Sequence, residues 1–111
     1  MKEIKAYVHR NRVADVIAAL KGSAAWSATG TDDHNLTLYM VKGSLLALDK
    51  GERHYSLDLG DEVVDEYKLE LHCEGGHVDE LVEVIRTSAR TSQTNSGWIY
   101  VTDIIRAVPI R

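Results

Sequence analysis

One stretch of the sequence decides the fold, and it reads VDELVEVIRTSAR (residues 78–90), TSQTNSG (91–97) and WIYVTDI (98–104). In the first segment apolar residues recur at helical spacing, which predicts a helix with one apolar face that needs a sheet beneath it. The third segment is rich in aromatic and β-branched residues, as strands are. The polar segment between them must turn the chain, and we expect its backbone N–H groups and hydroxyls to face water or a ligand.

Alternation of apolar and polar residues predicts three further strands, at residues 4–8, 36–40 and 67–73. With the two helices, the order is βαββαβ, which predicts one α+β domain of the ferredoxin-like type over residues 1–111. Its antiparallel sheet would carry both helices on one face. The other face is left uncovered, and an oligomer is the simplest way to bury it.

The first helix is expected from Arg12 to Lys21, with Asn11 as its cap and Gly22 as its C-terminal stop. Its apolar residues again follow helical spacing. The segment Ser23–Asp33 is expected to be a polar loop that holds Trp26.

A long segment joins the second and third strands, from Gly43 to about Glu62, and it has no clear periodicity. Loops of about twenty residues are uncommon in compact domains and are usually functional or disordered. Two interpretations stay open: a hairpin extension with its own short turn of helix, and a mobile arm that orders against a partner or a ligand. The side chains expected to contact a partner are Leu45, Leu46, Leu48, His54, Tyr55 and Leu57.

Composition disfavours several classes of protein. The net charge of −4 and the isoelectric point near 5.7 argue against a nucleic-acid binder. No apolar run approaches the roughly 20 residues that cross a bilayer, and the N-terminus lacks the apolar core of a signal peptide. We therefore expect a cytoplasmic protein that is not embedded in a membrane.

A cluster of metal-ligand type is formed by His72, Cys73 and His77, whose side chains suit zinc or copper. Adjacent strand residues point to opposite faces, so the competing interpretation makes Cys73 a small core residue. Catalysis is not indicated, because no spacing of a nucleophile and a base is present. Glu62, Asp65 and Glu66 are expected to form a solvated face.

Several motifs occur in a characteristic order along the chain. They are Val41-Lys42-Gly43, Lys68-Leu69-Glu70-Leu71, Ile85-Arg86-Thr87-Ser88-Ala89-Arg90-Thr91 and Ile99-Tyr100-Val101-Thr102-Asp103-Ile104-Ile105-Arg106. Together they resemble the PII family of trimeric signalling proteins, in which the first motif opens a long T-loop and the third leads into a B-loop. The resemblance covers nearly the whole chain, apart from extra residues around 26–33.

The resemblance implies a non-catalytic homotrimer that binds a small ligand between subunits and controls a membrane transporter or an enzyme through residues 43–62. The ligand residues that it implies are Thr37, Glu70, His72, Thr91, Ser92, Gln93, Asn95, Gly97 and Arg111. The similarly folded CutA proteins are tied to metal handling, which keeps metal binding at His72, Cys73 and His77 as the alternative function.

The chain departs from the family where phosphate would be held. Where the family has a lysine, an arginine near the C-terminus, and an arginine and a glutamine at the base of the T-loop, this chain has Trp98, Pro109, Leu46 and Ala47. Charge-assisted contacts to phosphate are the strong ones. We therefore expect ATP binding to be weak or absent and 2-oxoglutarate sensing to be lost. AMP, ADP, bicarbonate and a divalent metal ion stay open as ligands.

Overall fold

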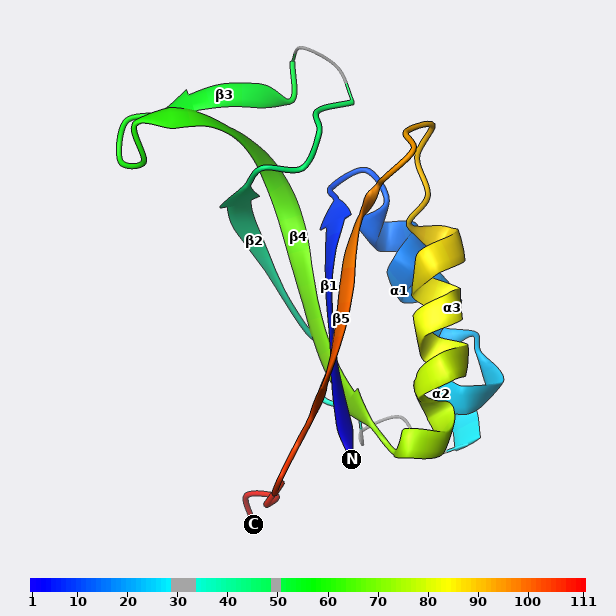
Figure 1. Cartoon of the computed structure of the whole chain (residues 1–111). Coiled ribbons are helices and arrows are strands. Elements are labelled where there is room, and N and C mark those ends of the chain that lie inside the picture. The colour runs from blue at the N-terminus through cyan, green and yellow to red at the C-terminus, as the bar shows by residue number, and fades with distance from the viewer. Residues whose placement is uncertain (29–33, 49–50) are drawn as a thin grey trace.

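The computed structural model describes residues 1–28, 34–48 and 51–111, in which helices lie beside an antiparallel sheet (Figure 1). The elements are β1 (Lys2–His9), α1 (Val13–Lys21), α2 (Ala24–Ala28), β2 (Thr37–Gly43), β3 (Arg53–Ser56), β4 (Asp61–Cys73), the 3₁₀ turn η1 (Gly75–His77), α3 (Val78–Ser88) and β5 (Gly97–Asp103). None of the helices in these ranges is long and apolar enough to cross a bilayer.

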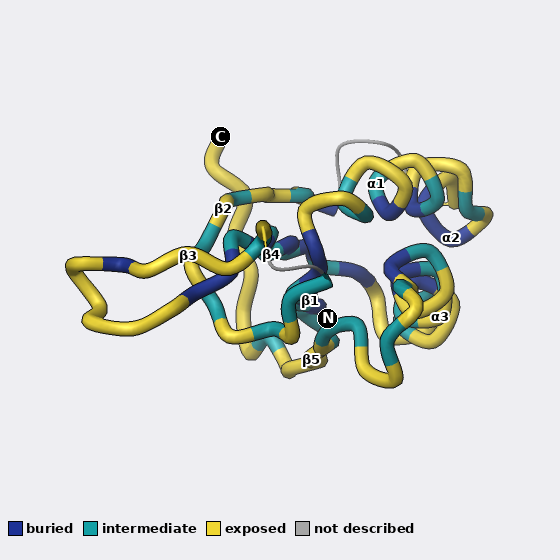
Figure 2. The backbone as a smooth tube through the Cα atoms, turned by 90° about the horizontal axis from the view of Figure 1, so that it is seen from above, coloured by how far each residue is buried: buried dark blue, intermediate teal, exposed yellow. Residues whose placement is uncertain are grey.

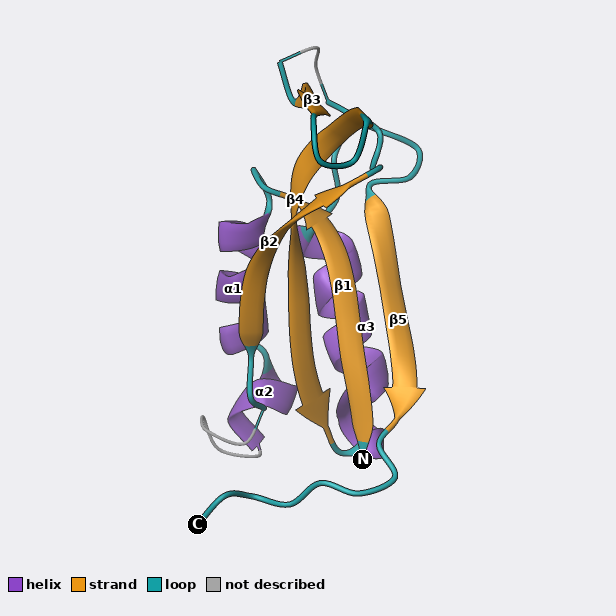
Figure 3. Ribbon diagram, turned by 90° about the vertical axis from the view of Figure 1, so that its left-hand side faces the viewer, coloured by secondary structure: helices purple, strands orange, loops and turns teal. Residues whose placement is uncertain are grey.

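The sheet has the order β2-β4-β1-β5, and every pair of neighbours is antiparallel. The helices cover one face of it, and the other face is bare (Figure 3). This arrangement confirms the predicted α+β ferredoxin-like fold. Three elements are additional to the predicted order: α2, η1, and the strand β3, which pairs with the first part of β4.

The core lies between the sheet and the helices. Strand residues such as Ile4, Ala6 and Leu69 alternate with residues of the opposite face, and they pack against Leu20 and Leu81 from α1 and α3. These side chains are buried. In the tube coloured by exposure, buried stretches occur both in the strands of the sheet and in the helices beside it (Figure 2). Burying apolar surface on this one side stabilises the layered arrangement.

The bare face of the sheet is aromatic and charged. Tyr7 and Tyr100 meet edge to face with their ring centroids 6.1 Å apart. The ammonium group of Lys68 lies 4.9 Å from the centroid of the Tyr39 ring and 5.9 Å from that of Tyr7. Cations over aromatic faces are attracted by the ring quadrupole. This surface is therefore ordered by its own contacts, although none of the described helices covers it.

Two predictions for the first helical region are wrong. The helix begins at Val13, and Arg12, not Asn11, occupies the capping position without a side-chain cap. Arg12 instead sends its guanidinium to the carbonyl oxygen of Ser88, at 2.8 and 3.2 Å. The predicted polar loop Ser23–Asp33 contains α2 and buries Trp26, which is 4% exposed. Residues 29–33 of that loop lie outside the described residues.

The long segment between β2 and β4 is a hairpin extension. We call residues 44–62 the arm; its strand β3 pairs with the beginning of β4, so β4 starts at Asp61 rather than near Tyr67. The hairpin turns at Leu57–Gly60, where Gly60 has a φ of +67° that favours glycine. No helix occurs in residues 44–48 and 51–62; a single turn is closed there by the N–H of Gly60, which donates to the carbonyl oxygen of Ser56 at 2.8 Å. The β3 hairpin of the arm projects away from the helices and the rest of the sheet (Figure 1).

Candidate functional site

Eight of the nine predicted ligand residues line two separate pockets in one chain, and Ser92 lines neither. Thr37, Glu70, His72 and Arg111 line a pocket of about 820 Å³ beneath the C-terminal tail. Thr91, Gln93, Asn95 and Gly97 line a second pocket, between the end of α3 and the strands β1 and β5. His72 pairs with Glu3 at one end of β1, whereas Gly97 pairs with Val8 at the other. A single chain therefore does not gather them into one site.

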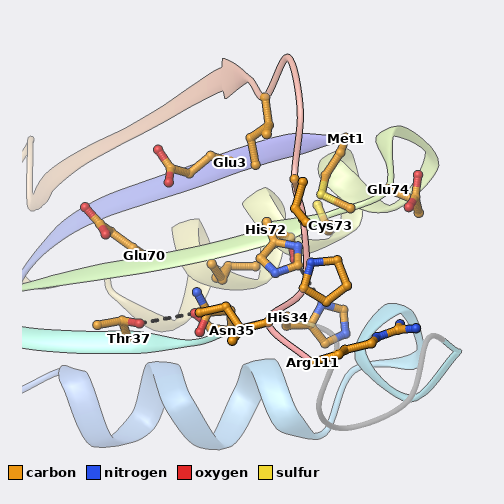
Figure 4. A pocket seen from close by; sticks show the side chains of 16 residues that line it. Met1, Glu3, His34, Asn35, Thr37, Glu70, His72, Cys73, Glu74 and Arg111 are labelled. Carbon is orange, nitrogen blue, oxygen red and sulfur yellow. Dashed lines mark hydrogen bonds between the residues drawn. The ribbon is translucent and has the colours of Figure 1, made fainter.

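The pocket beneath the tail is built on neighbouring strands. Thr37 and Glu70 lie opposite one another on β2 and β4, and His72 lies farther along β4 beside the tail (Figure 4). The hydroxyl of Thr37 donates to the carbonyl oxygen of Asn35 at 3.3 Å. The pocket is open, and its wall of tail residues includes Val108 and Ile110, which are exposed.

Glu70 is held in an ion pair on the bare sheet face. Its carboxylate lies 3.0 Å from the ammonium group of Lys68. A hydrogen bond from the Tyr39 hydroxyl and the charge of Lys68 lower the pKa of Glu70, whereas hydrogen bonds with Tyr39 and Glu70 raise the pKa of Lys68. Glu70 is consequently an anion at neutral pH, and its charge is already balanced.

The polar loop, residues 91–97, satisfies much of its own backbone. The N–H of Thr91 donates to the hydroxyl of Ser96 at 2.9 Å, that of Gln93 to the hydroxyl of Thr91 at 3.1 Å, and that of Gly97 to the side-chain oxygen of Asn95 at 3.0 Å. The expectation that these N–H groups face water or a ligand is therefore wrong for three of them. An anion at this loop would have to compete with bonds already made.

Gln93 joins the polar loop to the arm. Its amide nitrogen donates to the carbonyl oxygens of Leu46 and Ala47, at 2.8 and 3.1 Å. Its amide oxygen lies 3.1 Å from Nε2 of His9, at the end of β1. The loop and the base of the arm thus share one hydrogen-bonded joint, which links the two regions singled out in the sequence.

Two residues of this joint were missed in the sequence. Glu66 is 4% exposed, so its assignment to a solvated face is wrong; it accepts a hydrogen bond from the N–H of Leu45 at 3.3 Å. His9 is 1% exposed, and its Nδ1 lies 3.2 Å from the carboxylate of Glu52. The available signal was weak: a histidine directly after the buried Val8, and one of several acidic residues in a strand that reads as half apolar.

Burial raises the pKa of Glu66, against the opposing effects of the Leu45 N–H and of His9. A carboxyl group whose pKa is raised on folding stabilises the fold at pH values below its ordinary pKa of 4.5, and this contribution is lost as the pH rises. Glu66→Gln should therefore raise the free energy of unfolding at pH 7 by up to about 1 kcal/mol, because the amide avoids burying a charge.

Glu70→Gln is the matched comparison, and we expect it to change the free energy of unfolding at pH 7 in the opposite direction. A carboxyl group whose pKa is lowered on folding stabilises the fold at pH values above its ordinary pKa, and this contribution is lost as the pH falls. Removing the Glu70 charge should therefore lower the free energy of unfolding at pH 7 and change it little at low pH. Urea denaturation between about pH 3 and 8 measures both. A destabilised Glu66→Gln would mean that attraction to His9 outweighs the cost of burial.

The predicted metal cluster is not assembled. Cys73 is 3% exposed and belongs to the core, as its competing interpretation held, whereas His72 lies on the other side of the strand. Burial raises the pKa of the Cys73 thiol, which disfavours the thiolate that metals bind. Nδ1 of His72 and Nδ1 of His77 are buried without a hydrogen-bond partner. Across the described ranges, no three His, Cys, Asp or Glu side chains are grouped to hold a metal ion.

The arm presents most of its predicted partner residues to solvent. Leu46, His54, Tyr55 and Leu57 are exposed, the last of them by 89%. Leu45 and Leu48 are half-buried at the base. Large exposed apolar side chains on a projecting hairpin are typical of an interaction surface.

Comparison with known proteins gives relatives over the full chain, although no family model matches. The chain is 29% identical over 111 residues to nitrogen regulatory protein P-II 1 of Methanothermobacter thermautotrophicus, covering 100% of this chain and 90% of that relative. It is 27% identical over 111 residues to P-II 2 of the same organism, with the same coverage. The P-II protein of Porphyra purpurea is 23% identical over 112 residues, covering 100% of this chain and 92% of that relative.

Proposed function

Since this chain is a divergent regulatory protein of the PII family, we propose that it assembles as a cytoplasmic, non-catalytic homotrimer that senses a small ligand and controls a partner through the arm. The observation that carries the proposal is the joint at Gln93. A conformational change in the polar loop would displace Leu46 and Ala47, because the side chain of Gln93 in that loop donates hydrogen bonds to both of their carbonyl oxygens.

The bare sheet face supports the trimer. It carries Tyr7, Tyr39 and Tyr100, together with the charge pair of Lys68 and Glu70, and the helices that the structure describes all lie on the opposite face. Trimer formation would bury this aromatic surface. It would also bring the tail pocket of one subunit toward the polar loop of the next, so that the two halves of the ligand site complete one another.

The ligand we propose is an adenine nucleotide with a short phosphate chain, AMP or ADP rather than ATP. In the polar loop, the backbone N–H groups of Thr91, Gln93 and Gly97 already donate hydrogen bonds to side chains of the same loop. Arg90 lines its pocket, and Arg111 lies on the exposed tail. A site with few cationic side chains and few unused hydrogen-bond donors binds a ligand with one or two phosphate groups better than one with three.

The partner we propose is a membrane transporter or an enzyme, contacted by the exposed side chains Tyr55 and Leu57 of the arm. The metal alternative is not favoured, because Cys73 points into the core and the described residues offer no group of three ligands.

Light scattering coupled to gel filtration and thermal-shift measurements test the proposal. We expect a mass three times the 12.4 kDa of the chain. We expect AMP or ADP at millimolar concentration to raise the melting temperature by about 2 to 5 °C, and ATP to raise it less, because a ligand of the native state stabilises it by mass action.

Controls distinguish nucleotide binding from the alternative ligands in the thermal-shift experiment. Bicarbonate and Zn²⁺ are tested beside the nucleotides, and stabilisation by Zn²⁺ that is lost in His72→Ala would move the function to metal sensing. A monomer in solution, or strong stabilisation by ATP, would contradict the proposal. Turnover of a substrate by the pure protein would contradict its non-catalytic role.

A further inference from the structure

The buried ring of His9 faces an oxygen acceptor at each of its nitrogens. Nδ1 lies 3.2 Å from Oε1 of Glu52, in the arm, and Nε2 lies 3.1 Å from Oε1 of Gln93, in the polar loop. His9 stands at the end of β1, between the two segments. His9 therefore lies within hydrogen-bonding distance of both Glu52 in the arm and Gln93 in the polar loop.

The orientation of the Gln93 amide is fixed by its other neighbours. Its nitrogen lies 2.8 Å from the carbonyl oxygen of Leu46 and 3.1 Å from that of Ala47. Turning the amide over would lose both bonds and set its oxygen against two carbonyl oxygens. The amide oxygen must then be the atom that faces His9.

A neutral imidazole cannot satisfy both acceptors. It carries one N–H, so whichever nitrogen holds the proton, the other turns a lone pair toward Glu52 or toward Gln93. The imidazolium form donates at both nitrogens, and hydrogen bonds from a charged donor are the stronger ones. The charged form therefore fits this site better than either neutral tautomer.

The charges around the ring agree with a cation there. The carboxylate of Glu52 faces it from the arm, and Glu66 faces it from β4, where it stands opposite His9 in the strand register. Arg12 turns away, since its guanidinium bonds to Ser88 and lies 3.1 Å from Asp15. Arg10, the remaining cation nearby in the chain, is exposed.

We propose that His9 is a protonation switch that fastens the base of the arm to the polar loop. With both ring nitrogens protonated, Glu52 and Gln93 are held at once, and the arm is docked. When one proton leaves as pH rises, one of the two bonds becomes a repulsive contact and the arm loosens. This device needs neither a bound ligand nor a partner, so it stands or falls apart from the function proposed above.

Nuclear magnetic resonance on the whole chain tests the switch between about pH 5.5 and 8.5, the range in which histidine changes charge. The charge of the His9 ring is followed by its ring chemical shifts. Docking of the arm is followed by hydrogen exchange of the Leu48 amide, which donates to Glu52 at 3.1 Å, with rates referred to those of an unstructured peptide at each pH. We expect its protection to fall by about tenfold or more as His9 loses its charge.

Two variants and one control make the result specific. His9→Gln should abolish the pH dependence of Leu48 protection. Glu52→Gln, which leaves the buried ring in place, should move arm release to lower pH. His77→Gln, at the opposite end of the sheet, should leave the profile unchanged. Unaltered pH dependence in His9→Gln, or discharge of His9 with no change at Leu48, would overturn the proposal.

Discussion

Replacement of Gly97 by alanine is expected to lower the free energy of unfolding by about 3 kcal/mol or more. Gly97 has a φ of +154°, and a Cβ at this position would lie 2.1 Å from the carbonyl oxygen of Tyr7. That oxygen belongs to the backbone of the central strand β1, so the clash cannot be relieved by a side-chain rotation. Urea denaturation measures the loss.

Gly76→Ala is the matched control for this prediction. A Cβ at Gly76 meets no heavy atom within 4 Å, so the change should stay within about 0.5 kcal/mol. Equal stability of the two variants would contradict the close approach of β5 to β1. Because Gly97 also closes the polar loop, its replacement should loosen the loop as well as the sheet.

The fold follows from patterns that are local in the sequence. Leu81 and Ile85 recur at helical spacing in α3, and Ile4, Ala6 and Val8 alternate in β1, so each element carries its own signal for the face that it buries. The ends of elements are less well determined, since α3 ends at Ser88 and not at Arg90. Caps and strand ends depend on contacts that periodicity does not encode.

The hydrogen-bonded joint at the base of the arm could not be predicted in the same way. His9 and Glu66 are polar, and a polar side chain is expected at the surface unless its partner is known. Here the partner is far away in the sequence, since Glu52 meets His9 across 43 positions. The sequence predicts Gln93 as a ligand residue, but the direction of its amide depends on the path of the arm.

Replacement of Trp26 by alanine is expected to cost about 3 to 4 kcal/mol of folding stability, as for other buried aromatic residues. Trp26 lies in the short helix α2, where too few residues are present for a helical pattern to be recognised. Its ring stacks on that of His34, with centroids 4.2 Å apart and planes inclined by 26°. Alanine would leave a cavity beside a buried imidazole, whereas Trp26→Phe should lose less because a ring remains.

The second tryptophan of the chain is the control. Trp98 is 56% exposed, so Trp98→Ala should cost less than about 1 kcal/mol in the isolated chain. Each variant leaves a single tryptophan, whose fluorescence reports unfolding. If the bare sheet face self-associates, the effect of Trp98→Ala will grow with protein concentration, because association stabilises the native state by mass action. The effect of Trp26→Ala should not depend on protein concentration. If Trp26→Ala and Trp98→Ala lost equal folding stability in dilute solution, α2 would not belong to the core.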